Sequence, residues 1–427
     1  MSYPKKQAPV QPSAPADQDN ATEVRPEYFS HKRIFAALFC GFVLLYSLVQ
    51  IGYSGAAAFQ KHGWTGLLQS SYGSNVFGYA AWQESNGLLH RLLQKNEFNN
   101  FTFVKDRMGY LHYALLYYEH DGDQPIRYAK RIKWMRDLYQ RQNTKVYYVN
   151  IPSRYQPAES RRYIPGIPYQ DTHVLQDDLY LTLEQFHVPI IDIQKALQTE
   201  GLPYESWFYR TDLHWCTESA LFAAERMADA LRADGLPLPA LPPYSFESQR
   251  SSMLGTEGII TGRTYAGLDD FVQILPKDDY RYHWSAQKRD GTAYEASGTA
   301  QEVFLQPIQP EEPGKPSAYI NQYASYLGGS MAWQQIQNQS LPEAPRILLI
   351  GDTFCSPLLA YLAPVCSQVA QINPLAGDQD IEEHLQTHRY DAILVLFYPG
   401  NLTDAAFPFF EEKPASLPRA RQQEAAS

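Results

Sequence analysis

The C-terminal third of the chain alternates short apolar runs with helix-like segments, and this alternation restricts the fold more than any other feature of the sequence. Three runs have strand length and apolar centres, namely RILLIG, QVAQINP and YDAILVLFYPG. Such runs are typical of strands that are buried on both faces. The segments between them, CSPLLAYLA and DIEEHLQTHR, have helical character. Strands that alternate with helices predict an α/β fold with a mostly parallel sheet and helices on both faces.

The middle of the chain repeats this pattern. Helical spacing at 127–144, 175–186 and 218–233 accompanies the strand-like runs KVYYVNIPS and VPIIDI. Further upstream, FTFVKDRMGYLHY predicts a β-hairpin with a glycine turn. Residues 236–345 are irregular and rich in Pro, Gly and Tyr, with short strand-like pieces such as DDFVQIL, so we predict an insertion there that lines or covers a site. In parallel sheets of this kind, sites form at the carboxyl ends of the strands.

An apolar segment near the N-terminus predicts a membrane anchor. Residues 34–53 carry no charge and are long enough to span a bilayer. Lys32 and Arg33 precede the segment and the next positive charge is Lys61. The positive-inside rule therefore places the N-terminus in the cytoplasm and the rest of the chain outside. A cleaved signal peptide is the alternative, which the small residues after the segment allow and the long N-terminal region disfavours.

These features divide the chain into five parts. We predict a disordered cytoplasmic tail at 1–32, a transmembrane signal anchor at 33–53 and a stalk at 54–100. The extracytoplasmic domain is predicted at 101–412, and a loose tail at 413–427. The protein is therefore expected to be a single-pass membrane protein whose main domain lies outside the cytoplasm.

Charge and composition argue against several classes of protein. A net charge of −10 over 427 residues disfavours nucleic acid as a partner. One of the four cysteines, Cys40, lies in the apolar segment, and the three that remain do not describe a disulfide framework. The histidines show no spacing typical of metal ligands, and no phosphate-binding glycine motif is present. We therefore predict neither a metal nor a cofactor.

Two short motifs carry residues that fit a catalytic triad. In RILLIGDTF a buried strand leads through a Gly-Asp-Thr turn into a helix. The Thr353 hydroxyl is then at a helix N-terminus, which favours the negative charge formed during nucleophilic attack. In RTDLHWC, Asp212 and His214 point to the same face if the segment is extended. His214 is then the candidate base for Thr353, and Asp212 orients its imidazole.

Three neighbouring residues have alternative interpretations. Arg154 follows a strand end, where it meets an anionic substrate group or, as we favour, lies in solvent. Cys216 and Cys355 flank the predicted triad. Two buried thiols are the preferred interpretation, and a disulfide between them is the second. Cys355 as nucleophile comes last, because it is offset by two residues from the turn.

Four stretches resemble the DHHW family of SGNH-hydrolase-like membrane proteins, which are relatives of the alginate O-acetylation proteins. RTDLHW resembles the family's Asp-His-His-Trp or Thr-Asp-x-His-Trp motif, and LLIGDTFCSPL its Gly-Asp-Ser-Phe-Ser motif. KDRMGYLHY resembles the family's opening strand turn, and YLGGSMAW its Gly-Gly-Asn loop. The resemblance spans roughly residues 100–410.

The resemblance implies an SGNH-like α/β/α domain on the outer face of a membrane. It implies a membrane-bound O-acyltransferase partner as acyl donor, and O-acetylation of a cell-surface or secreted polysaccharide. Related proteins use a Ser–His–Asp triad with an oxyanion hole built partly from Gly and Asn. Carried over to this chain, the oxyanion contacts fall to Gly329 and Ser330, and Trp215 belongs to the matching Asp-x-His-Trp motif as a substrate contact. Arg154 is the further candidate for a substrate contact, from its place after a strand end.

The chain departs from the family pattern at two positions. Thr353 stands where the family has the nucleophilic Ser, and Ser330 where it has Asn. A Thr hydroxyl can act as a nucleophile, but its methyl group stiffens the side chain and crowds the attack path. We predict an O-acyltransferase with a Thr–His–Asp triad. The alternatives are an inactive accessory protein that binds polysaccharide or the acyltransferase partner, and an acetyl esterase with the same triad.

Overall fold

The computed structural model describes residues 26–56, 59–60, 78–114, 121–155, 161–169, 172–307 and 321–414. They belong to two compact units, and the division falls after Ala80. Most of the predicted N-terminal tail and nearly all of the predicted C-terminal tail lie outside the described residues.

The first unit contains one long helix, α1, which spans Pro26–Gln50 and continues as a π-helical turn over Ile51–Gly55. Within it, Arg33–Tyr53 has a mean hydropathy of 2.3 and is the one helix in the described part of the chain that is long and apolar enough to cross a membrane. Its position near the N-terminus suits a single-pass anchor or a signal sequence. Residues 26–32, predicted to be disordered, are helical, because a helix accepts proline in its first turn and the apolar run continues it.

A sheet of eight strands forms the centre of the second unit, in the order β5–β4–β13–β11–β12–β10–β8–β9. The first five strands are parallel, and the last three are antiparallel. Leu349 of β11 lies opposite Gln371 of β12 and Leu394 of β13. The bounds are β4 Lys145–Asn150, β5 Ile190–Asp192, β8 Tyr282–Gln287, β9 Ala293–Gly298, β10 Trp333–Asn338, β11 Arg346–Gly351, β12 Gln368–Ile372 and β13 Ala392–Leu396.

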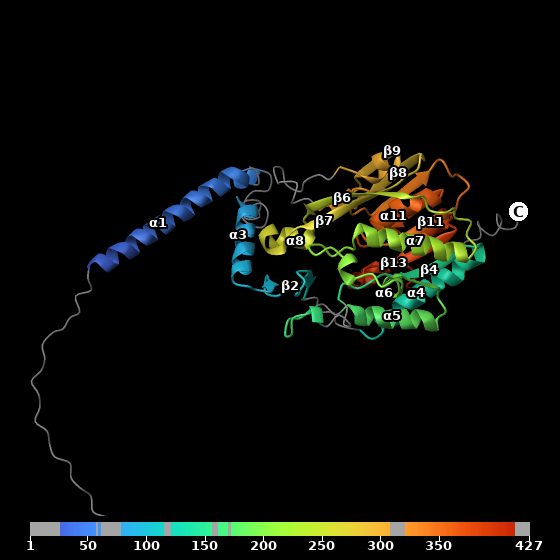
Figure 1. Cartoon of the computed structure of the whole chain (residues 1–427), viewed down its shortest axis with the longest axis horizontal. Helices are drawn as coiled ribbons and strands as arrows, with labels where there is room; N and C mark the ends of the chain where they lie inside the picture. Colours follow the sequence, from blue (N-terminus) through green and yellow to red (C-terminus); the bar gives the residue numbers. More distant parts are fainter. Residues whose placement is uncertain are drawn as a thin grey trace, which may run out of the picture. The chain divides into compact units, whose positions relative to one another are not determined.

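Helices cover both faces of this sheet. In β11, Ile347 and Leu349 join one apolar core, whereas Leu348 and Ile350 join the other. The first core includes residues of α6, α7 and α11, and the second includes residues of α4, α5 and α12. Figure 1 shows α7 and α11 together on one face. The predicted α/β/α sandwich with a mostly parallel sheet is therefore confirmed. The helices are α4 Gln124–Tyr139, α5 His173–Gln185, α6 Ile193–Thr199, α7 Thr217–Ala233, α11 Cys355–Leu362 and α12 Ile381–Thr387.

The region 236–345, predicted to be irregular, contains much β structure. Strands β8, β9 and β10 extend the central sheet, and β6 (Tyr244–Met253) pairs with β7 (Asp269–Pro276) in a separate ribbon. Helices α8 (Thr256–Thr261) and α9 (Arg263–Ala266) connect β6 to β7, and α10 (Ala300–Phe304) follows β9. Strands β8 and β10 alternate buried with partly or fully exposed residues, and β9 has no buried residue, so these three have no continuous apolar run. Their pattern therefore differs from that of the central parallel strands.

The domain begins before residue 101, where the stalk was predicted to end. Helix α3 (Tyr79–Leu92) packs closely against the segment after β6, and a Cβ on Gly87 would lie 2.8 Å from the carbonyl oxygen of Thr261. Strand β1 (Glu97–Phe98) pairs with β2 (Phe103–Lys105), which pairs with β3 (Leu111–Tyr113). The predicted hairpin is therefore present, with Gly109 in its turn at a φ of 88°.

Candidate active site

The loop of residues 209–216, here called the Asp-His loop, carries two of the predicted triad residues. It is not the extended segment that the sequence pattern predicts. A single β-bridge between Phe208 and Trp215 closes it, and bends fill most of the interval. Helix α7 begins directly after it at Thr217. Asp212 and His214 therefore meet because the loop folds back on itself.

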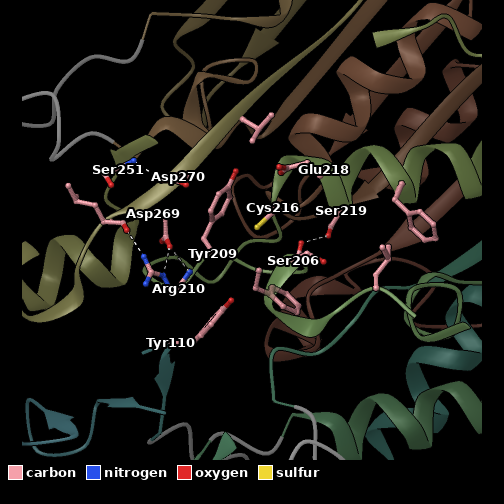
Figure 2. A pocket seen from close by; sticks show the side chains of 15 residues that line it. Tyr110, Ser206, Tyr209, Arg210, Cys216, Glu218, Ser219, Ser251, Asp269 and Asp270 are labelled. Atoms are coloured by element: carbon pink, nitrogen blue, oxygen red, sulfur yellow. Dashed lines mark hydrogen bonds and ion pairs between the residues drawn. The ribbon is translucent and has the colours of Figure 1, made fainter. Parts of the chain in front are cut away.

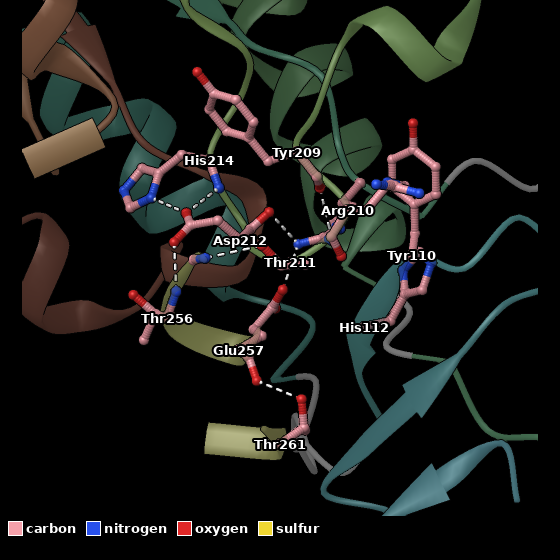
Figure 3. Close-up of polar contacts among 12 residues, drawn as sticks. Tyr110, His112, Tyr209, Arg210, Thr211, Asp212, His214, Thr256, Glu257 and Thr261 are labelled. Atoms are coloured by element: carbon pink, nitrogen blue, oxygen red, sulfur yellow. Dashed lines mark hydrogen bonds and ion pairs between the residues drawn. The ribbon is translucent and has the colours of Figure 1, made fainter. Parts of the chain in front are cut away.

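The carboxylate of Asp212 is fully buried and accepts hydrogen bonds at both oxygens (Figure 3). Its Oδ1 accepts the backbone N–H of His214 at 2.9 Å and lies 2.5 Å from Nδ1 of the same residue. Its Oδ2 accepts the backbone N–H of Thr256 at 2.8 Å and the amide of Asn321 at 2.7 Å. Burial acts to raise the pKa of Asp212, but His214 and the N–H donors outweigh it and hold the pKa below its ordinary value. The carboxylate is therefore ionised and fixes the orientation of the imidazole.

Thr353 lies just past the carboxyl end of β11, in the turn that leads into α11. Its Oγ1 is 2.6 Å from Nε2 of His214. Hydrogen bonds therefore join Asp212, His214 and Thr353 in one chain. The three residues come from two segments that are far apart in the sequence, and the structure brings them together as predicted.

The turn that holds Thr353 requires glycine at position 351. A Cβ on Gly351 would lie only 2.1 Å from the carbonyl oxygen of Leu396 on β13, closer than side chains allow. Asp352 then fixes the turn, because its Oδ2 accepts the backbone N–H of Tyr398 at 2.8 Å. The hydroxyl of Thr353 is thereby positioned by two parallel strands.

Aromatic side chains pack around the imidazole of His214. The ring of Tyr323 stacks on His214 with 4.2 Å between centroids and 21° between planes. The Tyr323 hydroxyl accepts the indole N–H of Trp215 at 3.1 Å. Trp215, predicted to line the substrate site, has 0% exposure and packs on Phe354. That prediction was wrong, because both the ring and the N–H of Trp215 are used inside the core.

Arg154 is also buried rather than directed at a substrate. It follows β4 as the sequence indicates, but only 2% of the residue is exposed. Its guanidinium donates to carbonyl groups of the Asp-His loop and forms an ion pair with Glu257. Both sequence interpretations, a substrate contact and a solvated arginine, were wrong.

The loop of Gly328, Gly329 and Ser330 lies against the start of α11. The hydroxyl of Ser356 donates to the carbonyl of Gly329 at 3.5 Å. Gly328 and Gly329 have φ values of 70° and 85°, which glycine adopts without strain. The N–H of Gly329 donates to Tyr326 at 3.3 Å within its own turn, which argues against it as the predicted oxyanion donor. Ser330 is exposed.

Cys216 and Cys355 are both free thiols, as the preferred interpretation has it, and the alternative disulfide between them is not formed. Cys355 is fully buried, and burial raises the pKa of its thiol, so it is a poor nucleophile. Cys216 instead lines a pocket of about 530 Å³ together with Tyr209 and Arg210 (Figure 2). The lining of this pocket includes none of the three triad residues, so it is separate from the reacting hydroxyl.

Sequence reasoning missed residues that hold the Asp-His loop or its histidine, among them Asp269, whose carboxylate accepts the backbone N–H groups of Arg210 and Thr211. Asn321 and Tyr323 lie shortly before the glycine loop in NQYASYLGG. Their closeness to that loop was the only sequence feature that could have indicated them. Thr256 and Glu257 open α8, and nothing in their local sequence marks them. Within the described residues, no cluster of three or more His, Cys, Asp or Glu side chains could hold a metal ion.

Comparison with known proteins identifies the fold. Residues 107–303 match the family model described as "SGNH hydrolase-like domain, acetyltransferase AlgX". This range includes Asp212 and His214 but ends before Thr353. No curated protein matches the chain.

One solved structure shares the fold at low sequence identity, and two further structures match with lower TM-scores. PatB1 of Bacillus cereus, solved with a sulfonyl adduct, is 16% identical with a TM-score of 0.58, and the match covers 73% of this chain and 99% of that one. A DHHW family protein of Eubacterium siraeum is 15% identical with a TM-score of 0.49, covering 72% and 97%. The O-acetyltransferase domain of Pseudomonas putida AlgJ is 13% identical with a TM-score of 0.44, covering 70% and 91%. Residues 107–303 are therefore similar to an SGNH hydrolase-like domain of the kind described for acetyltransferase AlgX, and the chain shares its fold with PatB1.

Proposed function

We propose that this chain is a membrane-anchored, extracytoplasmic O-acyltransferase that acetylates a polysaccharide through Thr353. The observation that carries the proposal is the hydrogen-bonded chain from Asp212 to His214 to Thr353, with links of 2.5 Å and 2.6 Å. A hydroxyl within hydrogen-bond reach of a base, and a base oriented by a buried carboxylate, satisfy the geometry of covalent acyl transfer.

The reaction runs in two halves that share the same base. First, Oγ1 of Thr353 attacks the acyl carbonyl carbon of the donor, and its proton moves to Nε2 of His214. The donor's alcohol or thiol leaves with that proton, and the acyl group remains as an ester on Thr353. A sugar hydroxyl then attacks the ester and gives its proton to His214, which returns it to Thr353 as the acetylated sugar leaves. Asp212 is ionised and buried, and it stabilises the imidazolium in both halves.

Each half-reaction forms an oxyanion that needs hydrogen-bond donors. The first three backbone N–H groups after Thr353 are used inside the turn itself. We therefore assign the oxyanion contacts to the N–H of Thr353 and to Ser330, whose loop contacts α11 through Gly329. Loss of one oxyanion donor typically costs about 10²–10³ in kcat, so Ser330→Ala is expected to slow turnover on that scale.

Threonine as nucleophile makes this a slow site. A β-branched side chain has restricted χ1 rotation, and the methyl group of Thr353 occupies space beside the path of the incoming carbonyl. The hydroxyl nevertheless lies within hydrogen-bond distance of His214, so the rotamer needed for attack is the one that the site holds.

The acceptor, the donor partner and the membrane placement extend this proposal beyond the triad. The matching family model is named for an acetyltransferase, which supports acetyl as the transferred group. Lys32 and Arg33 precede the apolar helix, which supports a cytoplasmic N-terminus and an outer catalytic domain. There the acyl group would come from a membrane-bound O-acyltransferase partner that passes it across the membrane, and the acceptor would be a polysaccharide hydroxyl.

The substitution at 353 also favours a second candidate, an inactive accessory protein that binds polysaccharide or the acyltransferase partner. One experiment separates the acyltransferase from the accessory protein. The detergent-solubilised full chain is exposed to p-nitrophenyl acetate and quenched in acid, and the mass of the peptide that contains Thr353 is measured by mass spectrometry. We expect one acetyl group on Thr353, and none in His214→Ala. Absence of both the acetyl-peptide and nitrophenol release supports the accessory role.

An acetyl esterase remains the third candidate, with water in place of the sugar. Adding an oligosaccharide acceptor to the same assay separates it from the transferase. For the transferase, acetylated sugar should rise at the expense of free acetate. An unchanged yield of acetate assigns the chain as an esterase.

A further inference from the structure

The Asp-His loop is held largely by residues from other segments. The carboxylate of Asp269 on β7 accepts the backbone N–H groups of Arg210 and Thr211 at 3.1 Å and 2.8 Å. The N–H of Leu111 on β3 donates to the carbonyl of Arg210 at 2.9 Å. A loop without regular secondary structure keeps its shape only if its backbone groups find such partners.

One buried side chain, Arg154, supplies the donors for three carbonyls of this loop. Its Nη1 donates to the carbonyl of Asp212 at 2.6 Å, and its Nη2 donates to those of Tyr209 and Arg210, each at 2.9 Å. The side chain of Arg154 is 3% exposed. Hydrogen bonds made away from water are electrostatically stronger. This guanidinium therefore holds the backbone of Asp212, the residue that orients His214, in a fixed position.

Glu257 supplies the counter-charge that keeps this guanidinium in place. Its Oε2 lies 2.7 Å from Nη1 of Arg154, and its side chain is 1% exposed. Glu257 follows Thr256, whose N–H holds the carboxylate of Asp212. A Cβ on Gly255 would lie 2.2 Å from Cβ of Asp212, so the start of α8 is in close contact with the loop. The same short segment therefore holds Asp212 directly by its carboxylate and, through Arg154, by its carbonyl.

We propose that Arg154, fixed by Glu257, is a positioning residue for the triad: its guanidinium sets the backbone of Asp212 so that the carboxylate faces His214. This inference rests on the function proposed above. The geometry requires arginine, because a planar fork reaches several carbonyls at once, whereas a lysine ammonium is a compact point charge. The contacts of Arg154 with the loop are to backbone carbonyls, so it acts through the loop and not on the substrate.

Arg162 offers a matched control in the same unit. It is 5% exposed, forms an ion pair with Asp106, and its guanidinium lies 3.9 Å from the ring of Tyr110 and 4.1 Å from that of Tyr204. It is therefore also a buried, paired arginine, but its partner Asp106 belongs to the β2–β3 turn and not to the Asp-His loop. Arg162→Lys should destabilise the fold through the loss of these ring contacts and leave Asp212 in place.

The test compares Arg154→Lys with Arg162→Lys in the detergent-solubilised full chain at about pH 8, where Glu257 is ionised. Thermal melting gives the stability of each variant, and acetyl-ester kinetics give kcat and KM. The third readout is the low-field proton NMR resonance of the Nδ1–H that His214 donates to Asp212. Since a misplacement of about 1 Å costs about a hundredfold in rate, we expect Arg154→Lys to lose about a hundredfold in kcat with KM nearly unchanged. It should also lose the resonance, whereas Arg162→Lys should keep both.

Two results overturn the inference. One is a resonance that survives in Arg154→Lys, and the other is a kcat loss that Arg162→Lys matches at equal loss of melting temperature. If Arg154→Lys does not fold, Glu257→Gln replaces it, because glutamine keeps an acceptor for Nη1 of Arg154 and removes only the charge. The Nδ1–H resonance of His214 should then shift or broaden. An unchanged resonance in Glu257→Gln overturns the inference. Failure of the proposed function has a different signature, which is equal turnover in wild type and Thr353→Ala, and the resonance then decides the positioning role by itself.

Discussion

Replacing Asp212 by Asn tests the orienting role of the buried carboxylate, because the surrounding donors leave no suitable orientation for an amide. Oδ1 faces the N–H and the Nδ1 of His214, and Oδ2 faces the N–H of Thr256 and the amide of Asn321. If the new NH₂ group takes the Oδ1 position, Nδ1 of His214 must become an acceptor. The proton then sits on Nε2, which can no longer take the proton of Thr353. If NH₂ takes the Oδ2 position, it meets the N–H of Thr256.

The first orientation predicts a large kinetic loss through the wrong tautomer, and the second predicts a loss because a neutral amide does not stabilise the imidazolium as a carboxylate does. Both predict a moderate loss of stability. The comparable Asp-to-Asn change in a serine protease triad costs about 10⁴ in kcat through the wrong tautomer, and we expect a loss of at least about 10³ here. One buried N–H is left without an acceptor in either orientation, which costs roughly 1–3 kcal/mol. Folding lowers the pKa of Asp212, so the ionised carboxylate stabilises the fold above about pH 4 and this contribution is lost as the pH falls. The Asn variant lacks that part of the acid sensitivity.

The assay is acetyl-ester turnover beside urea unfolding at several pH values. A kcat for Asp212→Asn above a tenth of the wild-type value would refute the orienting role. If Asp212→Asn has the same free energy of unfolding as the wild type, the argument that the amide leaves a buried N–H without an acceptor is refuted.

Three further changes follow from the same geometry. Gly351→Ala should lower the free energy of unfolding in urea by about 3 kcal/mol or more, because its Cβ would meet the carbonyl of Leu396 at 2.1 Å; a loss under about 1 kcal/mol contradicts the close approach. Tyr323→Phe keeps the ring on His214 but leaves the buried indole N–H of Trp215 unpaired. The melting temperature should therefore fall, while kcat stays within several-fold of the wild-type value. A hundredfold loss of kcat would assign the Tyr323 hydroxyl a direct role. Burial raises the pKa of Glu257 to about 7, so its protonated form contributes stability that is present below about pH 4.5 and is lost as the pH rises through about 7. Because glutamine is neutral at every pH, the wild type should lose free energy of unfolding relative to Glu257→Gln over that window, and a pH-independent difference contradicts this.

The sequence predicts the part of the site that lies on regular structure. A parallel strand buried on both faces is apolar along its whole length, so RILLIG could be assigned, and its carboxyl end is where such sheets place their sites. Thr353 followed directly from this. Asp212 and His214 were paired correctly, but through strand alternation, whereas the loop joins them by folding the carboxylate onto the His214 N–H.

Residues around the triad were harder to assign because sequence does not reveal whether a side chain faces a site or supports it. Trp215 and Arg154 lie next to functional residues, yet both are buried and act on the protein itself. Their partners, Tyr323 and Glu257, come from distant segments and carry no local motif. In region 236–345 the strand-like run DDFVQIL was recognised and is β7. Strands β8 and β9 were missed for a related reason, because half-exposed antiparallel strands have no long apolar run.

The most direct test of the account is acetyl-ester turnover by the detergent-solubilised full chain, measured for the wild type beside Thr353→Ala, Thr353→Ser and His214→Ala. The hydrogen bond between Thr353 and His214 predicts turnover that is lost in both alanine variants and kept or raised in Thr353→Ser. A wild type without turnover, with activity appearing only in Thr353→Ser, would contradict the account, because the methyl group would then disable the site and the accessory role would remain.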